Sequence, residues 1–386
     1  MTELTFRPAG LRADGALFAD WWHTVDRWTI GAVALLFALG MVLALAASPP
    51  LAEKNDLWTY HYVLRHAVFA VLALGVVLGV SAVPAHLLRR GGAVAFLGFF
   101  AITLMLPAFG TDFGKGATRW YSLGFISLQP SEFLKPAFVL IAAWLMAGAA
   151  ERNGPPGRLI SGALAIAIAT TLALQPDFGQ AMLTLAVWAV MLFVSGAPLF
   201  LLIGLAGAVG LAGTAAYLNS SHFAGRINGY LAEEVDPNTQ LAYAQSAIRE
   251  GGLFGVGAAQ GSVKWTLPDA HTDFIIAVAA EEFGLILTLL IIGIYLFIVV
   301  RALLRLLEER NMFIRLAGTG LAAAFALQAF INMSVAIRLL PAKGMTLPFI
   351  SYGGSSMVAA ALGVGALLAL TRARPQDPGA SLRDSI

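Results

Sequence analysis

An aspartate stands where a long polar segment meets a strongly apolar one. Residues 268–273 read Pro-Asp-Ala-His-Thr-Asp and end at Asp273, and the apolar run Phe-Ile-Ile-Ala-Val follows directly at residues 274–278. A carboxylate at the boundary of a membrane span is partly desolvated and costly to retain, so it indicates a functional site. At that depth it is within reach of a polar head group whose hydrocarbon tail stays in the bilayer. The position of Asp273 therefore predicts a general base acting on a lipid-linked substrate.

Basic residues occur in several segments on the same predicted side of the membrane. They are Arg65, Lys115, Arg119, Arg338 and Lys343. Lys and Arg side chains hold and stabilise a diphosphate leaving group, either alone or together with a divalent metal. Brought together, these residues would form an anion site, whereas each one taken singly is more typical of a membrane-interface anchor.

Two carboxylates open further apolar runs. Glu132 and Lys135 stand three residues apart, which places them on one face of a helix and predicts an ion pair at the membrane boundary. The pair has two open interpretations, a structural one and a substrate-binding one. Asp177 lies in the tight turn Gln-Pro-Asp-Phe-Gly-Gln at residues 175–180 and is another candidate for substrate contact.

The segment 344–356 combines Pro348 with two adjacent glycines ahead of the last apolar run, and it contains Ser355. Irregular backbone at membrane depth is tolerated only where it is buried in protein or lines a cavity. Exposed amides at such a helix start can hold an anion, and close helix packing by small residues is the alternative.

The elements that must position these side chains are membrane-spanning helices. The chain has 386 residues, of which 59% are hydrophobic and only 12% charged, and its mean hydropathy is +0.78. This composition excludes an ordinary soluble protein and is typical of a polytopic membrane protein. Uncharged runs recur near the ~20 residues that a spanning helix needs, so we expect an all-α fold with about ten spans. The predicted spans are residues 29–48, 66–85, 91–109, 132–150, 159–175, 178–195, 199–218, 274–300, 316–338 and 349–371.

The basic residues also predict the orientation. An even number of spans places both termini on one side, and the basic residues of the termini and loops on that side are all arginines. The positive-inside rule therefore places both termini in the cytoplasm and the long loop 219–272 outside. Residues 1–28 are then a cytoplasmic segment with an interfacial helix, residues 29–371 the membrane domain, and residues 372–386 a cytoplasmic tail. The chain has no cysteine, which excludes disulfides and thiol chemistry.

The chain resembles the family of shape, elongation, division and sporulation proteins over nearly its whole length. The resemblance rests on five motifs in the family's order. They are Lys-Gly-Ala-Thr-Arg-Trp at 115–120, Leu-Gln-Pro-Ser-Glu-Phe-Leu-Lys at 128–135, the turn at 175–180, Pro-Asp-Ala-His-Thr-Asp-Phe at 268–274 and Ser-Tyr-Gly-Gly-Ser-Ser at 351–356. The segment Pro-Ala-Lys-Gly-Met-Thr-Leu-Pro at 341–348 is similar to the division members, with the elongation members as the related alternative.

The resemblance implies a peptidoglycan glycosyltransferase that polymerises lipid II in the bacterial cytoplasmic membrane at the division septum. It implies as partners a class B penicillin-binding protein, the transpeptidase that cross-links the strands, and other division proteins. Asp273 falls on the family's essential aspartate, so the resemblance implies a catalytic role for it. The residues expected to bind substrate are Arg65, Lys115, Arg119, Glu132, Lys135, Asp177, His271, Lys343 and Ser355. Asp269 stands where the family more usually has Glu, which leaves the charge unchanged.

In the implied reaction, the 4-hydroxyl of one disaccharide attacks the anomeric carbon of another and expels a polyprenyl diphosphate. Because this leaving group is already activated, one carboxylate acting as base on the acceptor hydroxyl is sufficient, and Asp273 is the candidate. Mg²⁺ or Mn²⁺ is a candidate cofactor for the departing diphosphate, although the sequence contains no dedicated cluster of metal ligands.

Two other functions stay open at this point. A transporter that flips the lipid-linked precursor across the membrane would use polar residues deep in the bundle, namely Glu281, Asn332 and Arg338. A non-catalytic division scaffold would instead use the cytoplasmic arginines and the external loop as contact surfaces. An Asp273→Ala variant that still supports division would favour the scaffold.

Overall fold

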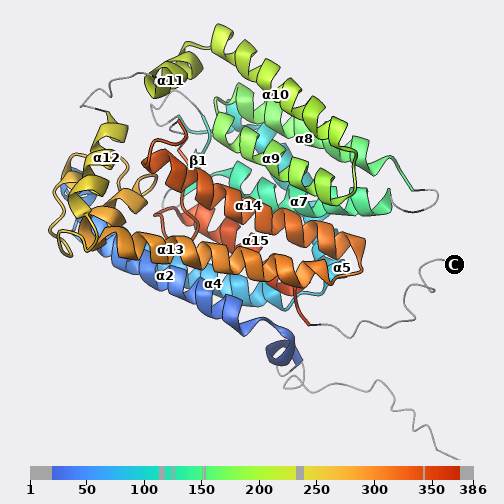
Figure 1. Ribbon diagram of the computed structural model, residues 1–386, viewed down its shortest axis with the longest axis horizontal. Coiled ribbons are helices and arrows are strands. Elements are labelled where there is room, and N and C mark those ends of the chain that lie inside the picture. The colour runs from blue at the N-terminus through green and yellow to red at the C-terminus, as the bar shows by residue number, and fades with distance from the viewer. Residues whose placement is uncertain are drawn as a thin grey trace, which may run out of the picture.

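The computed structural model describes residues 20–112, 118–122, 124, 127–149, 151, 154–231, 239–341 and 344–373, apart from the side chains of His222 and Arg226. Its long helices lie side by side in a single bundle (Figure 1). Eight are long and apolar enough to cross a membrane: α2 (Arg27–Ala47), α4 (His61–Ser81), α5 (Ala85–Leu104), α7 (Pro130–Gly148), α8 (Gly157–Leu174), α10 (Leu199–Asn219), α13 (Ile275–Leu307) and α14 (Met312–Ala336). Two shorter apolar helices accompany them, α9 (Phe178–Val194) and α15 (Gly354–Leu370).

Each predicted span overlaps one of these helices, so the all-α membrane fold is confirmed, while the number of crossings stays a prediction. The separation of the sixth and seventh segments is also correct, because α9 ends at Val194 and α10 begins only at Leu199. Three predicted starts were wrong, and the start of α5 is Ala85 in place of residue 91. Helix α4 begins at His61, so Arg65 lies within its second turn and not ahead of it. Helix α15 begins at Gly354, because Phe349 has a φ of 68°, which a right-handed helix does not contain.

The segment predicted as the long external loop contains helices of its own. They are α11 (Ser221–Leu231), α12 (Gln240–Gly251) and the 3-10 helix η1 (Val263–Trp265). Figure 1 shows α11 and α12 together at one end of the bundle. Short helices α3 (Pro49–Lys54) and α6 (Leu106–Phe109) and a two-stranded antiparallel sheet, β1 (Tyr121–Ser122) with β2 (Ser127–Leu128), were not predicted either. These elements are too short for hydropathy to reveal.

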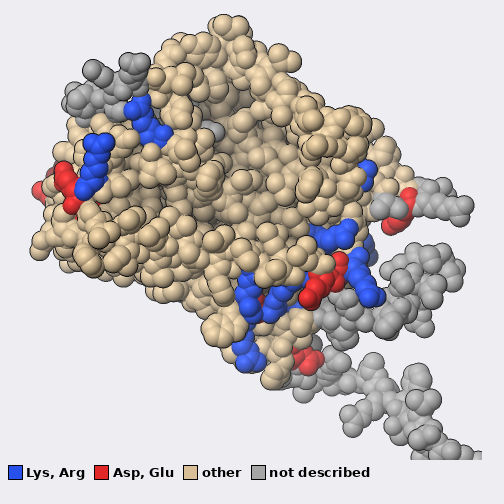
Figure 2. Space-filling model, viewed as in Figure 1, with Lys and Arg blue, Asp and Glu red and all other residues tan. Residues whose placement is uncertain are grey.

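Arginines gather where α13 ends, at the end of the bundle away from α12 (Figures 1 and 2). Two of them clamp the N-terminus of α2, since Arg301 Nε lies 2.5 Å and Arg305 Nη2 lies 3.4 Å from the carboxylate oxygens of Asp26. The positive-inside rule assigns this end to the cytoplasm. Nearby, buried Trp21 donates from Nε1 to Ser81 Oγ at 3.0 Å, so this residue of the predicted interfacial helix packs on the bundle.

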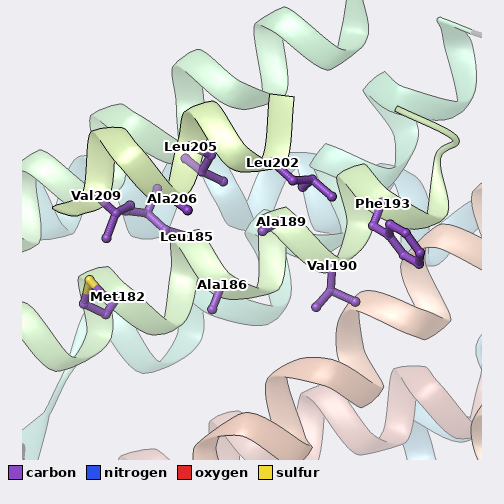
Figure 3. A pocket seen from close by; sticks show the side chains of 10 residues that line it. All are labelled: Met182, Leu185, Ala186, Ala189, Val190, Phe193, Leu202, Leu205, Ala206 and Val209. Carbon is purple, nitrogen blue, oxygen red and sulfur yellow. The ribbon is translucent and has the colours of Figure 1, made fainter. Parts of the chain in front are cut away.

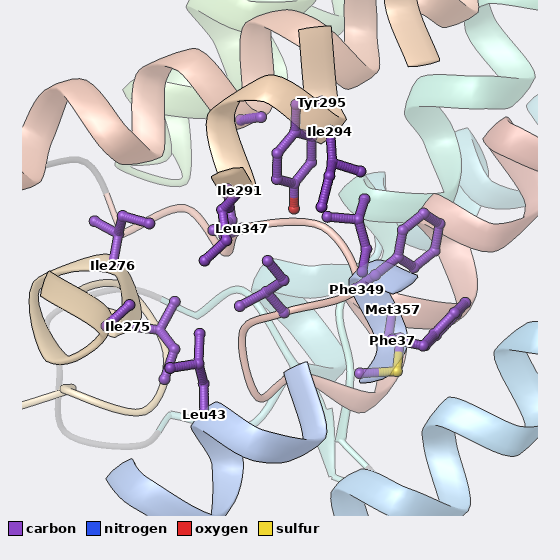
Figure 4. Close-up of a cluster of buried hydrophobic side chains, with 14 of the residues drawn as sticks. Phe37, Leu43, Ile275, Ile276, Ile291, Ile294, Tyr295, Leu347, Phe349 and Met357 are labelled. Carbon is purple, nitrogen blue, oxygen red and sulfur yellow. The ribbon is translucent and has the colours of Figure 1, made fainter. Parts of the chain in front are cut away.

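Two hydrophobic clusters fill the bundle. One involves mainly α2, α4, α12, α13 and α15, and the other mainly α5, α7, α8, α9 and α14. Figure 4 shows part of the first cluster, in which the ring of Phe349 lies 4.6 Å from that of Phe37 between centroids. The ring of Phe325 lies 5.9 Å from Phe349. The non-helical segment before α15 is therefore anchored in the core, although its backbone is irregular.

Gly40 permits the close approach of α2 to this segment. A Cβ added at Gly40 would lie 2.4 Å from the carbonyl oxygen of Phe349. We expect Gly40→Ala to force the two backbones apart and to lower the free energy of unfolding by about 1–3 kcal/mol, as overpacking does. Thermal unfolding in lipid nanodiscs measures this change. Gly31→Ala on the same helix is the control, because a Cβ there meets nothing within 4 Å. Equal melting temperatures for the two variants would contradict the close approach of Gly40 to the carbonyl of Phe349.

Candidate active site

Asp273 occupies the last turn before α13. Its backbone N–H donates to the carbonyl of Asp269 at 3.1 Å, and Asp269 has a φ of 55° that closes the turn. The carbonyl of Asp273 accepts from Asn332 Nδ2 of α14 at 3.0 Å. A Cβ added at Gly344 would lie 3.6 Å from Asp273 Oδ2. The carboxylate therefore lies beside the start of the segment that leads to α15.

That segment and the Asp273 turn hold each other in place. Ser351 Oγ donates to the carbonyl of Thr272 at 2.5 Å and accepts from the N–H of Leu347 at 2.8 Å. The N–H of Tyr352 donates to the carbonyl of His271 at 2.9 Å. Asn332 Nδ2 also donates to the carbonyl of Met345, at 2.5 Å. Motifs far apart in the sequence thus form one rigid backbone frame around Asp273.

Glu132 and Lys135 form the predicted ion pair, and both are buried. Lys135 Nζ lies 2.8 Å from Glu132 Oε2 and donates to Gln328 Oε1 of α14 at 2.7 Å. Gln180 Nε2 of α9 donates to the second oxygen of Glu132. Gln328 Nε2 in turn donates to the carbonyl of Thr346 at 3.1 Å. The pair is therefore connected, through one side chain, to the frame that holds Asp273.

Asp177 lies on the other side of this cluster. It is 4% exposed and accepts from Gln129 Nε2 at 3.4 Å, while the N–H of Gln129 donates to Ser355 Oγ at 3.4 Å. Burial raises the pKa of the Asp177 carboxyl, the charge of Arg119 opposes this, and the charge of Glu132 adds to it. Ser355 and Asp177, both predicted to bind substrate, are thus joined through one glutamine.

The raised pKa of Asp177 makes a prediction about stability. A carboxyl whose pKa rises on folding stabilises the fold below its ordinary pKa, and that contribution is lost as the pH rises through the raised value. At neutral pH we therefore expect Asp177→Asn to melt at a higher temperature than wild type, with the difference shrinking as the pH falls toward about 4. Melting curves in nanodiscs across this range measure it. Exposed Asp56→Asn is the control, and a difference that persists unchanged at low pH would argue against burial as the cause.

The basic residues do not gather into one anion site among the described residues. Arg119 Nε donates to the carbonyl of Gln175 at 3.3 Å, and its guanidinium also donates to the carbonyl of Pro176, so Arg119 holds the turn that precedes Asp177. Arg338 donates to the carbonyl of Tyr230 at 3.0 Å. Burial raises the pKa of the Tyr352 hydroxyl, and the charge of Arg65 opposes this rise. Lys115 and Lys343 lie outside the described residues, so their predicted roles stay predictions.

Two carboxylates deeper in α13 bind the external segment. Glu281 Oε1 accepts from the N–H groups of Ser262 and Val263 at 2.6 and 2.8 Å. Glu282 pairs with Lys264 at 2.5 Å and accepts from the N–H of Ala259 at 2.7 Å. Glu282 therefore holds a cation, Lys264, against the helix. Both carboxylates dock the loop on the helix.

Metal ligands do not gather in the described part of the chain. No group of three or more His, Asp or Glu side chains there could hold a metal ion. A divalent cation at a diphosphate needs only one or two protein carboxylates, because phosphate oxygens and water complete its octahedral shell. The residues present therefore fit a cation that arrives with its substrate, and do not fit a permanently caged one.

Two cavities lie away from this network. A cavity of about 670 Å³ lies at the arginine-rich end and includes Arg89 and Trp144. A groove of about 440 Å³ between α9 and α10 has an entirely apolar lining (Figure 3). Its lining residues are Met182, Leu185, Ala186, Ala189, Val190, Phe193, Leu202, Leu205, Ala206 and Val209. It contains no side chain that could act on a sugar or a phosphate.

Several residues of the network were not predicted as site residues from sequence. Gln129 and Gln180 lie inside the motifs at 128–135 and 175–180, in which only the charged residues were predicted to bind substrate. Gln328 joins α14 to α7 through Lys135, and both Gln328 and Asn332 donate to carbonyls of the segment before α15. Their spacing of four residues, which puts both on one face of α14, was the available signal.

The fold and the site define a class: a polytopic helical membrane protein with a carboxylate in a framed turn at the start of one helix and a buried charged cluster joined to that frame. The model of the cell cycle protein family of FtsW, RodA and SpoVE matches residues 26–376. The chain belongs to this family.

Named relatives and solved structures agree with that assignment. The chain is 40% identical to the probable peptidoglycan glycosyltransferase FtsW of Caulobacter vibrioides, over 96% of this chain and 95% of that protein. It is 35% identical to the FtsW of Halorhodospira halophila, with 90% of each chain covered. A chain of a peptidoglycan synthase complex superposes with a TM-score of 0.77 at 28% identity, covering 92% of this chain and 99% of that one. The rod shape determining protein RodA of Thermus thermophilus superposes with a TM-score of 0.68 at 26% identity, with the same coverage.

Proposed function

We propose that this chain is a peptidoglycan glycosyltransferase that polymerises lipid II during cell division, with Asp273 as its general base. The observation that carries this proposal is the frame around Asp273. Its turn is tied to α14 through Asn332 and to the segment before α15 through Ser351. A base must be held in position to take a proton in the transition state, and such a frame provides this. The FtsW names of the relatives support the division role over the elongation role.

In the proposed reaction, the carboxylate of Asp273 accepts the proton of the acceptor 4-hydroxyl as that oxygen bonds to the anomeric carbon of the second substrate. The bond between this carbon and the diphosphate oxygen breaks, and the diphosphate leaves with the electron pair. Inversion at the anomeric carbon follows from direct displacement. One carboxylate is sufficient, because the diphosphate leaves without protonation by a strong acid.

The diphosphate needs positive charge, and the structure changes the order of the candidates for this role. Lys135 is already paired with Glu132, so much of its charge is compensated inside the protein. Arg119 is engaged with the turn before Asp177. Arg65, Lys115 and Lys343 keep their predicted role at the leaving group, and Lys343 directly precedes Gly344, whose added Cβ would lie 3.6 Å from Asp273 Oδ2. We therefore assign Lys135 the role of a positioning residue.

A divalent cation, Mg²⁺ or Mn²⁺, would supply further charge stabilisation at the diphosphate when bound. Substrate oxygens and water would supply most of its ligands, because the described residues offer no group of three or more His, Asp or Glu side chains that could hold it. Chelation with EDTA and restoration with each metal tests this requirement directly.

We further propose that the chain works with a class B penicillin-binding protein at the septum of the inner membrane. The solved complex of a structural relative, in which polymerization and crosslinking are coordinated, supports a transpeptidase partner. The proposed membrane location is supported by the apolar helices. A fluorescent fusion that labels the side wall and not midcell would overturn the division assignment.

The experiment that tests the function is strand synthesis from purified components. The protein is reconstituted with its cognate transpeptidase and incubated with lipid II, and the products are separated on a gel. We expect a ladder of glycan strands that depends on this chain. No strands under any condition, with folded protein and active transpeptidase, would leave the flipping or scaffold function in its place.

The transporter alternative gains no support from the deep polar residues. Glu281 binds amides of the external segment, Asn332 binds backbone carbonyls, and Arg338 binds the carbonyl of Tyr230. In each case the side chain secures a loop to a helix. These contacts favour a rigid catalytic frame over a polar path for a moving head group.

A further inference from the structure

Three aromatic side chains from separate elements meet next to Asp273. They are Tyr62 of α4, His271 of the turn before α13, and Tyr352 of the segment before α15. The centroid distances are 5.5 Å from Tyr62 to Tyr352, 5.6 Å from His271 to Tyr352 and 6.1 Å from Tyr62 to His271. All three rings are partly exposed. His271 is two residues from Asp273, so the cluster lies beside the proposed base.

Two of the three rings have contacts outside the cluster. The N–H of Tyr352 donates to the carbonyl of His271, which ties together the backbone segments that carry these two rings. Tyr62 Oη accepts from Asn55 Nδ2 at 3.1 Å. The ring of His66 also packs on Tyr352, at a centroid distance of 6.4 Å and an interplanar angle of 27°. Tyr62 and Tyr352 are therefore held by residues outside the cluster as well as by each other.

His66 is an unusual support for such a cluster. It is 1% exposed, and neither of its ring nitrogens has a hydrogen-bond partner among the described residues. A buried polar group without a partner costs free energy that a hydrocarbon ring of similar shape would not. What His66 contributes in this structure is its flat ring, packed between α2 at Gly40 and Tyr352. The position is thus occupied by a planar side chain that holds Tyr352 from behind.

A Tyr or His ring presents an apolar face and a polar edge. A sugar ring has the complementary character, with C–H groups on its faces and hydroxyls around its rim. A partly exposed aromatic surface beside a base therefore suits a saccharide whose hydroxyl must point at that base. A diphosphate would instead bind to cations and backbone amides, and a polyprenyl chain would bind in a wholly apolar groove.

We propose that Tyr62, His271 and Tyr352 form an aromatic wall that packs against the sugar whose hydroxyl Asp273 deprotonates. The wall would orient the acceptor saccharide beside the base. This inference rests on the proposed function, because it assigns the sugar of the acceptor lipid II to a surface beside the base. Tyr62 and Tyr352 thereby become substrate-contacting residues in addition to His271.

The test compares ligands with and without sugar. Tyr352→Leu removes the ring, and Tyr352→Phe keeps it. With reconstituted protein, we expect Tyr352→Leu to weaken binding of fluorescent lipid II at least about tenfold while binding of a fluorescent polyprenyl diphosphate changes less than about twofold. Tyr352→Phe should bind lipid II within about threefold of wild type. Trp58→Leu is the matched control, because Trp58 is a 64% exposed aromatic residue on a preceding loop and outside the wall.

The same variants give a kinetic readout. Tyr352→Leu should raise the KM for lipid II more than it lowers kcat, whereas a general loss of structure would lower kcat and the melting temperature together. If Tyr352→Leu does not fold, Tyr62→Leu takes its place with the same expectation. Equal loss of affinity for lipid II and for the polyprenyl diphosphate would overturn the proposal that the aromatic wall binds the sugar. Unchanged lipid II binding in a folded variant would overturn it too. Absence of strands from wild type would instead overturn the proposed function, so the two failures are distinct.

Discussion

Replacing Asp273 with alanine or asparagine is expected to abolish strand synthesis from lipid II while leaving the protein folded. The loss of general-base assistance alone corresponds to about 10²- to 10⁴-fold in rate. Both variants keep the backbone contacts of this turn, because the carbonyl of Asp273 accepts from Asn332 and its N–H donates to the carbonyl of Asp269. Strand formation on a gel, with lipid II binding measured in parallel, gives the result.

The control for this variant is available in the same turn. Asp269→Asn removes a negative charge only four residues away, and asparagine tolerates the positive φ of this position. We expect it to synthesise strands at a rate within a few-fold of wild type. Equal activity of Asp273→Asn and wild type would remove Asp273 from the mechanism, even if the protein proved to be a polymerase.

Lys135→Met is expected to be the most destabilising single change in the cluster. It leaves Glu132, which is 3% exposed, without its cation, and it leaves Gln328 Oε1 without its donor. Breaking a buried ion pair by removing one partner typically costs about 3–5 kcal/mol, because the remaining charge stays buried without compensation. The melting temperature in nanodiscs should fall accordingly. Lys54→Met, at an exposed lysine, is the control and should melt like wild type.

A second variant separates stability from function at this site. In Lys135→Met with Glu132→Gln, no uncompensated charge remains, so most of the lost stability should return. Activity should stay low, because Lys135 also orients Gln328 and, through it, the carbonyl of Thr346. A double variant that recovers both stability and full activity would show that the pair is structural only.

The site was predicted unevenly from sequence, and the physical reason differs from residue to residue. The ion pair of Glu132 with Lys135 depends on a spacing of three within one helix, so the local pattern was sufficient. The anion site expected from scattered lysines and arginines has no such local pattern, because an arginine can bind a nearby carbonyl instead, as Arg119 and Arg338 do. The aromatic wall joins residues of three distant segments, and no local pattern marks them.

The class of the protein, the approximate positions of its apolar helices and the place of Asp273 at a loop-to-helix boundary could all be predicted from sequence. Each of these depends on composition, length and neighbours along the chain. Which apolar residues face the core became clear only from the packing of the helices. In a membrane chain, a lipid-facing side chain is as hydrophobic as a buried one, so hydropathy does not separate Phe138, which is 1% exposed, from Phe193, which is 64% exposed. Because helix pairing follows from those faces, the network that frames Asp273 emerges only when the helices are packed.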